Sequence, residues 1–273
     1  MIRRNVTINT KQVAYWENNG QRPEVVILLH GLGGDHRGLV PLTSRLNKFR
    51  LLMPDLPGYG LSDPLIDEHS IINYVAFLDS FRKEIGLRKF YLIGHSFGGA
   101  IALMYAKIHP AQIIKVGLLN PALGGHDKVS WKLGRRYAKF AGFLPDKMCH
   151  FLLCNKLTVY FADRALMTSE GKEYRKKILS QDYLNYHRAS TRALKESITA
   201  LDDLAIDNFI PDRHTDLFIL FGKKDRLVTP EFAAKFSSLL KQPLVGFLAG
   251  GHLLPLEDPK TVGNFINQSL NSS

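Results

Sequence analysis

Short apolar runs alternate with helical patterns along most of this chain. The runs rich in Val, Ile and Leu are 24–29, 50–53, 89–93, 115–119, 217–221 and 244–248. Continuous apolar runs of this length are typical of parallel strands that helices cover on both faces. Helical patterns separate several of them, at 39–46, 70–85, 96–108, 231–240 and 260–270. The alternation predicts a doubly wound α/β sheet, and short alternating strands at 6–8 and 13–16 predict a hairpin at its edge.

One long stretch interrupts the alternation. Between residues 121 and 204 no convincing strand occurs, and helical patterns rich in Leu and aromatic residues replace it. We therefore expect an all-helical insertion at 121–204 within a core formed by residues 1–120 and 205–273. Its apolar residues are expected to pack it onto the sheet and to line an apolar pocket; they include Tyr137, Phe140, Phe143, Phe151, Tyr160 and Phe161.

Composition narrows the class of protein and its compartment. Hydrophobic residues make up 45% and charged residues 22% of the 273 residues, which is ordinary for a folded globular chain. The two cysteines, Cys149 and Cys154, cannot form a disulfide framework and lack zinc-site spacing. No apolar run approaches the roughly 18 residues of a membrane-spanning helix, and the basic start lacks the apolar region of a signal peptide. We expect a cytoplasmic protein with reduced thiols and no transmembrane segment.

The chain is basic, with a net charge of +11. The predicted insertion contains 15 Lys and Arg against 9 Asp and Glu, so it carries more than half of the excess. The ordinary explanation of this basic excess is a helical surface exposed to solvent. The alternative is that the basic insertion binds an acidic carrier protein or anionic lipid. The sequence contains no zinc finger or basic-aromatic strand signature, so we expect no nucleic-acid partner. A nucleic-acid module would instead show strongly salt-dependent binding.

The sequence KFYLIGHSFGG at 89–99 carries a G-x-S-x-G motif between a predicted strand and a predicted helix. In this context a serine at the centre, Ser96, lies on a sharp turn where flanking side chains would clash. The N-terminus of the following helix then points its unpaired N–H groups at the serine. The motif therefore predicts that Ser96 is a nucleophile.

A nucleophilic serine requires a base and an acid that orients the base. His252 follows the last apolar strand on a Gly-Gly loop, and Asp225 lies one loop after the penultimate strand. Both lie at carboxyl ends of strands, where the chemistry of such sheets gathers. We expect His95 to be structural, with its side chain pointing away from the sharp turn that carries Ser96, and His30 to have a packing role.

An acyl-transfer site also needs donors for the oxyanion. The segment HGLGG at 30–34 follows the first long apolar strand, and its glycines let backbone N–H groups approach a substrate. The loop lacks the P-loop lysine and the dinucleotide-binding spacing. The backbone N–H groups of Leu32 and Phe97 are the expected oxyanion hole.

These motifs together resemble the α/β-hydrolase superfamily, more specifically a serine hydrolase of its esterase and lipase-like branch. The resemblance rests on HGLGG at 30–34, DLPGYGLSD at 55–63, GHSFGG at 94–99, GKKDRLVTP at 222–230 and GGHLLPLEDP at 250–259. It implies an eight-stranded, mostly parallel sheet with helices on both faces and a helical cap after strand six. It implies no cofactor and no metal, because acyl transfer by a Ser96–His252–Asp225 triad needs neither.

The resemblance leaves several activities open. The first is cleavage of a small-molecule carboxylic ester with an apolar acyl or alcohol part, through an acyl-enzyme on Ser96. The others are C–C bond hydrolysis of vinylogous diketones, a monoacylglycerol-type lipase, an acyl-carrier-protein ester hydrolase, and a ligand receptor on a hydrolase scaffold. Fold and triad define the bond chemistry, and the substrate depends on the pocket.

Overall fold

The computed structural model describes residues 1–18, 22–123, 129–168, 184–202, 206–211, 215–241 and 243–272. Its centre is one eight-stranded sheet in the order β1-β2-β4-β3-β5-β6-β7-β8. The strands are β1 (Ile2–Ile8), β2 (Lys11–Glu17), β3 (Val25–Leu29), β4 (Arg50–Pro54), β5 (Phe90–His95), β6 (Ile113–Leu119), β7 (Leu217–Gly222) and β8 (Leu244–Leu248). The β1–β2 hairpin and the β2–β4 pair are antiparallel, and every pair from β4 to β8 is parallel. The prediction of an eight-stranded, mostly parallel sheet is confirmed.

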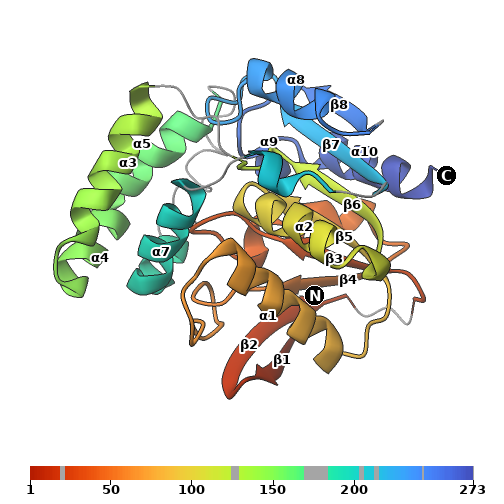
Figure 1. The fold of residues 1–273 in the computed structure, drawn as a ribbon, viewed down its shortest axis with the longest axis horizontal. Coiled ribbons are helices and arrows are strands. Elements are labelled where there is room, and N and C mark those ends of the chain that lie inside the picture. Colours follow the sequence, from red (N-terminus) through yellow and green to blue (C-terminus); the bar gives the residue numbers. More distant parts are fainter. Residues whose placement is uncertain are drawn as a thin grey trace.

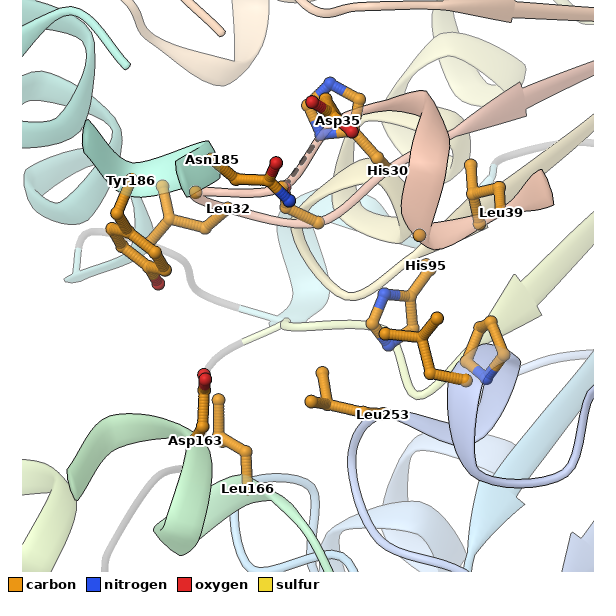
Figure 2. A pocket seen from close by; sticks show the side chains of 16 residues that line it. His30, Leu32, Asp35, Leu39, His95, Asp163, Leu166, Asn185, Tyr186 and Leu253 are labelled. Atoms are coloured by element: carbon orange, nitrogen blue, oxygen red, sulfur yellow. Dashed lines mark hydrogen bonds between the residues drawn. The ribbon is translucent and has the colours of Figure 1, made fainter. Parts of the chain in front are cut away.

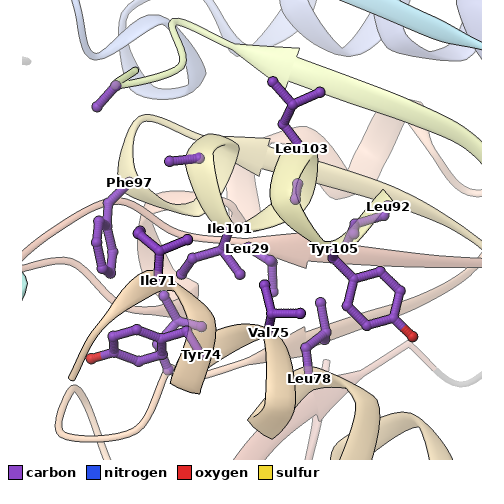
Figure 3. Close-up of a cluster of buried hydrophobic side chains, with 14 of the residues drawn as sticks. Leu29, Ile71, Tyr74, Val75, Leu78, Leu92, Phe97, Ile101, Leu103 and Tyr105 are labelled. Atoms are coloured by element: carbon purple, nitrogen blue, oxygen red, sulfur yellow. The ribbon is translucent and has the colours of Figure 1, made fainter. Parts of the chain in front are cut away.

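Helices cover both faces of this sheet (Figure 1). The side chains of β3 alternate between two cores: Ile27 and Leu29 join one, and Val26 and Leu28 join the other. The first core lies under α1 (Ile71–Glu84) and α2 (Phe97–Ile108), and Figure 3 shows Tyr74, Leu78 and Ile101 of these helices meeting there. The second core lies under η2 (Val40–Arg45) and α10 (Pro259–Asn271). Burial on both faces explains why the strands read as continuous apolar runs.

The helix starts follow from their caps. Helix α8 (Pro230–Ser238) begins after Thr229, whose hydroxyl accepts a hydrogen bond from the Phe232 N–H. The Asp258 carboxylate accepts from the Thr261 N–H in the same way at the start of α10. Both helices have proline in the first turn, where a missing N–H costs nothing. A short helix, α9 (Leu254–Glu257), follows His252 and precedes α10.

One predicted helix is a different element. Residues 39–46 do not form an α-helix; two 3₁₀ segments, η1 (His36–Gly38) and η2, occupy this part of the chain. Its hydrogen bonds join residues three apart, as from Leu42 N to Leu39 O and from Leu46 N to Thr43 O. Pro41 lies in the first turn of η2, and short 3₁₀ pieces are a common form for such connectors.

Between β6 and β7 every described secondary-structure element is an α-helix or a 3₁₀ turn. These elements are α3 (Val129–Gly142), α4 (Asp146–Cys154), α5 (Lys156–Leu166), α7 (Thr191–Asp202) and the 3₁₀ turn η4 (Ile206–Phe209). We call α3, α4, α5 and α7 the inserted helices; Figure 1 shows them together at one end of the sheet. Cys149 and Cys154 lie on α4 as free, buried thiols. No helix in the described part of the chain is long and apolar enough to cross a membrane.

The expectation that the aromatic residues of this segment pack it onto the sheet is wrong for most of those named above. Phe140, Phe143, Phe151 and Phe161 are between 60% and 89% exposed. The inserted helices instead bury small and aliphatic residues such as Ala141, Leu153 and Val159. Composition alone cannot show which side of an isolated helix faces the core, so it overestimated the burial of the phenylalanines.

Candidate active site

Ser96 lies on a sharp turn between β5 and α2. Its backbone has φ 52° and ψ −114°, a conformation that costs a non-glycine residue energy and that persists only where neighbours enforce it. The two flanking glycines explain the turn: a Cβ on Gly94 would lie 2.1 Å from the Gly98 carbonyl oxygen, and one on Gly98 would lie 2.6 Å from the Leu29 oxygen. The first turn of α2 therefore packs directly on the backbone at the end of β3.

The structure brings the three predicted site residues into one hydrogen-bonded row. The Ser96 Oγ lies 2.7 Å from His252 Nε2, and His252 Nδ1 lies 2.8 Å from Asp225 Oδ2. All three side chains are buried, and they come from the loops after β5, β7 and β8. The carboxyl ends of three parallel strands therefore assemble the row, although the residues are up to 156 positions apart.

Asp225 is held as an anion. Its Oδ1 accepts hydrogen bonds from the N–H groups of Leu227 (2.7 Å) and Val228 (3.0 Å). Burial alone would raise the pKa of this carboxyl, but the charge and hydrogen bond of His252 together with the two amides lower it below its usual value. The second oxygen, Oδ2, is thereby left to accept the proton on His252 Nδ1. That hydrogen bond places the unprotonated Nε2 of a neutral imidazole toward Ser96.

Asn120 and His95 hold the loop that carries His252. The Asn120 Nδ2 donates to the carbonyl oxygens of Gly251 and His252, both at 2.9 Å, and its Oδ1 accepts from the Gly222 N–H. Because Gly222 ends β7, one side chain ties the loop that carries Asp225 to the loop that carries His252. His95 Nε2 donates to the His252 oxygen at 2.8 Å. The expectation that the His95 side chain points away from the turn at Ser96 is wrong, since its ring reaches the His252 backbone.

Glu257 connects the same loop to the inserted helices. Its Oε2 accepts hydrogen bonds from the N–H of Gly251 (3.2 Å) and from the N–H and hydroxyl of Thr168. The carbonyl of Leu166, the last residue of α5, accepts from the His252 N–H at 2.8 Å. The end of α5 is therefore bonded directly to the backbone of His252. No role could be assigned to Asn120 or Glu257 from the sequence, because each acts through contacts with distant segments; Glu257 lies within the GGHLLPLEDP segment at 250–259.

The glycine loop after β3 lies against Ser96. A Cβ on Gly31 would meet the Ser96 Cβ at 3.2 Å and the His95 Nδ1 at 3.3 Å. This contact places Leu32, the next residue, close to the turn that carries Ser96. Phe97 begins α2, where N–H groups have no partner within the helix. His30 is structural, as expected: its Nε2 accepts from the Leu56 N–H at 2.9 Å.

A cavity of about 70 Å³ adjoins the row. Figure 2 shows His95 and Leu253, the chain neighbours of Ser96 and His252, on one side, with Asp163 and Leu166 of α5 across from them. Asn185 and Tyr186 form a further wall (Figure 2). The apolar part of the lining is Leu32, Leu39, Leu166, Leu253, Pro255 and Leu256. Both the core and the segment between β6 and β7 thus contribute walls.

One group of three possible metal ligands occurs among the described residues, Asp35, His36 and Asp55. Its atoms are engaged in hydrogen bonds: His36 Nδ1 bonds Asp55 Oδ1 at 2.8 Å, and Arg37 bonds both oxygens of Asp35. The Leu61 N–H donates to the second oxygen of Asp55. This chemistry fits a structural junction between the glycine loop and the turn after β4.

The buried histidines predict acid sensitivity of the fold. Burial lowers the pKa of His95 to about 3, and burial lowers that of His30 as well. Both are neutral in the folded protein and take up a proton on unfolding below about pH 6.5. Stability therefore falls as pH decreases from about 6.5, by up to about 1.4 kcal/mol per pH unit for each fully shifted histidine. Urea unfolding at several pH values measures this slope. We expect a shallower slope in His95→Asn, and an unchanged slope would contradict the assignment.

Comparison with known proteins identifies the family of this fold. The family model described as alpha/beta hydrolase fold matches residues 24–259. The 2-hydroxy-6-oxo-2,4-heptadienoate hydrolase of Pseudomonas putida is 27% identical over 90% of this chain and 88% of its own. Lipase 3 of Moraxella sp. is 23% identical over 93% of this chain and 79% of its own. An esterase structure from Thermogutta terrifontis aligns with a TM-score of 0.81 at 18% identity, over 99% of this chain and 98% of that one. The chain belongs to the α/β-hydrolase family.

Proposed function

We propose that this protein is a serine hydrolase that cleaves a small carboxylic ester with an apolar acyl or alcohol part. The observation that carries the proposal is the row of hydrogen bonds from Ser96 Oγ through His252 to Asp225 Oδ2, at 2.7 and 2.8 Å. A buried serine bonded to a histidine that a carboxylate orients is the arrangement of an activated nucleophile. The apolar lining of the adjoining cavity supports an apolar substrate group.

In the proposed reaction, Ser96 Oγ attacks the ester carbonyl while His252 Nε2 takes the serine proton. His252 then gives this proton to the departing alcohol, and the C–O bond of the ester breaks to leave an acyl group on Ser96. Water, deprotonated by His252, releases the acid and restores the serine. Asp225 holds the imidazole tautomer and stabilises its positive charge throughout. The Leu32 and Phe97 N–H groups are the proposed donors to the oxyanion, each worth about 3 kcal/mol in such sites.

The segment between β6 and β7 is the proposed cap, with boundaries near 121 and 204. The support is that Leu166 and Asp163 of α5, and Asn185 and Tyr186, line the same cavity as the glycine loop. The free, buried thiols of Cys149 and Cys154 support a cytoplasmic location, where thiols stay reduced.

A C–C bond hydrolase of vinylogous diketones is the second candidate, because the Pseudomonas putida relative, which aligns over 90% of this chain, is named as a hydrolase of 2-hydroxy-6-oxo-2,4-heptadienoate, a compound of that class. The two activities are separated by comparing turnover of p-nitrophenyl esters, from acetyl to long acyl chains, with cleavage of a dienone substrate of the vinylogous diketone class. We expect ester turnover with an optimum at short acyl chains, because the cavity of about 70 Å³ is small for a ligand site. Dienone cleavage without ester turnover would replace the proposal by the C–C reaction, and a long-chain optimum would favour a lipase.

A further inference from the structure

The inserted helices expose large apolar side chains. Eight such residues of α3, α4, α5 and the turn after α3 are exposed, by between 37% and 89%: Tyr137, Phe140, Phe143, Met148, Phe151, Leu157, Tyr160 and Phe161. We call these eight residues the apolar patch. Single exposed apolar residues are common, but several aromatic side chains gathered on neighbouring helices mark a surface that binds something.

Helical spacing places the exposed residues of each helix on one side. On α5, Leu157 and Phe161 are four residues apart and Arg164 follows three later, so all three lie along one stripe. Met148 and Phe151 on α4 are three residues apart and likewise share one side of their helix. The other sides of these helices are buried, through Cys149, Leu153 and Cys154 on α4 and Val159 on α5. The exposed side of each helix is therefore the outer side of the inserted segment.

Contacts between the helices make the apolar patch one surface. The Tyr137 hydroxyl of α3 donates to the Leu152 carbonyl of α4 at 2.9 Å and lies 3.5 Å from the Thr158 hydroxyl of α5. Leu152 follows Phe151 and Thr158 follows Leu157, so apolar residues of all three helices surround this junction. Figure 1 shows α3, α4 and α5 at the outer end of the molecule, with α7 on the side of the core.

The charges around the apolar patch are nearly all positive. Exposed basic residues accompany it on all three helices: Arg136, Lys139, Lys147, Lys156 and Arg164. Of the two acidic residues on α4 and α5, Asp146 faces Lys195 at 3.6 Å and Asp163 is buried beside the cavity. Among the described residues of α3–α5, the exposed surface therefore joins aromatic rings with a net positive charge.

We propose that this surface docks on an anionic lipid bilayer. Amphipathic helices that bind the interface combine Phe and Leu, which enter the boundary between headgroups and acyl chains, with Lys and Arg that reach the phosphates. A second copy of the chain fits less well, because an isologous contact would bring two sets of five like charges together in a desolvated interface. The proposal does not depend on the bond that Ser96 cleaves.

Flotation of the full chain with vesicles tests the docking. We expect the protein to float with mixed phosphatidylcholine and phosphatidylglycerol vesicles. Its binding to vesicles of phosphatidylcholine alone should be weaker by about tenfold or more. Raising NaCl from about 0.1 M to about 1 M shortens the Debye length from about 10 Å to about 3 Å and should release most of the protein. The Ser96→Ala variant should bind like the wild type, which separates docking from hydrolysis.

Two matched double variants assign the surface. Phe143→Asp with Phe151→Asp puts two charges into the apolar patch and should lower vesicle binding about tenfold or more. Ile66→Asp with Ile72→Asp makes the same change at two exposed apolar residues outside the inserted helices and should leave vesicle binding unchanged. A charge reversal, Lys147→Glu with Lys156→Glu, should weaken binding to anionic vesicles and leave the weak binding to neutral ones unaltered.

Four results would overturn the proposal. The first is absence of binding to anionic vesicles at low salt. The second is equal loss of binding in the patch and control variants, because the loss would then reflect charge alone or misfolding. The third is a wild-type dimer in light scattering that becomes a monomer in the patch variant, and the fourth is tight binding of an acidic carrier protein without vesicle binding. Either would show that a protein covers the apolar patch.

Discussion

Replacing Ser96 with alanine is expected to lower kcat for a p-nitrophenyl ester by roughly 10⁴- to 10⁶-fold, with KM nearly unchanged. The reason is geometric: the Ser96 Oγ lies 2.7 Å from His252 Nε2, and the substitution removes the atom that we propose attacks the ester. The residual rate would come from binding and the oxyanion donors alone. Steady-state kinetics on the ester that the wild type prefers measures the change.

Ser238 offers a matched control for this experiment. It is an exposed serine at the end of α8. In the described part of the chain, its hydroxyl donates to the carbonyl oxygen of Lys235 in the same helix. Ser238→Ala should keep the wild-type rate, and both variants should keep the wild-type thermal midpoint within a few degrees. Turnover in Ser96→Ala above about a tenth of the wild-type rate would exclude Ser96 as the nucleophile.

Asp225→Asn is expected to lower kcat by about 10⁴-fold without loss of the fold. The Asn side chain keeps the shape of Asp225 and can still accept from the amides of Leu227 and Val228. Its NH₂ group, however, would then face His252 Nδ1 and favour the imidazole tautomer with the proton on Nε2. That tautomer cannot accept the proton of Ser96.

Asp216 provides the control for Asp225, because it lies just before β7 at the opposite end of the strand. Its carboxylate pairs with Lys115 at 3.1 Å, at the end of the sheet opposite to the one that carries Ser96, His252 and Asp225. Asp216→Asn should leave kcat unchanged. A loss of less than about tenfold in Asp225→Asn would assign the orienting role elsewhere, since a wrong tautomer alone costs more than this.

Much of the fold could be predicted from the sequence because its signals are local. The strands begin and end within a few residues of the apolar runs, since parallel strands buried on both faces admit few polar residues. The starts of α8 and α10 follow from Thr229 and Asp258, whose capping bonds involve residues only three positions away. At 39–46 the pattern predicts a helix, and the structure has the short 3₁₀ helix η2 there, a common form for a connector of this length.

The parts that sequence reasoning missed depend on contacts between distant segments. Asn120 is a polar residue at a strand end, and only the structure shows that it bridges Gly222 and the His252 loop, more than 100 residues away. Glu257 likewise joins Gly251 to Thr168. An asparagine directly after an apolar strand, at the sheet edge where Ser96, Asp225 and His252 are expected, is a signal that could have identified Asn120. Glu257 lies within the GGHLLPLEDP segment at 250–259, but the local sequence does not show which distant backbone groups it bonds.

The central claim is that Ser96 is the nucleophile, and covalent trapping tests it most directly. The native protein is treated with a fluorophosphonate, which reacts with activated serines, and the adduct is located by peptide mass spectrometry. We expect one adduct per chain, on the peptide that contains Ser96, with labelling abolished in Ser96→Ala and strongly slowed in Asp225→Asn. An unlabelled native protein, or an adduct on a different residue that persists in Ser96→Ala, would contradict the account.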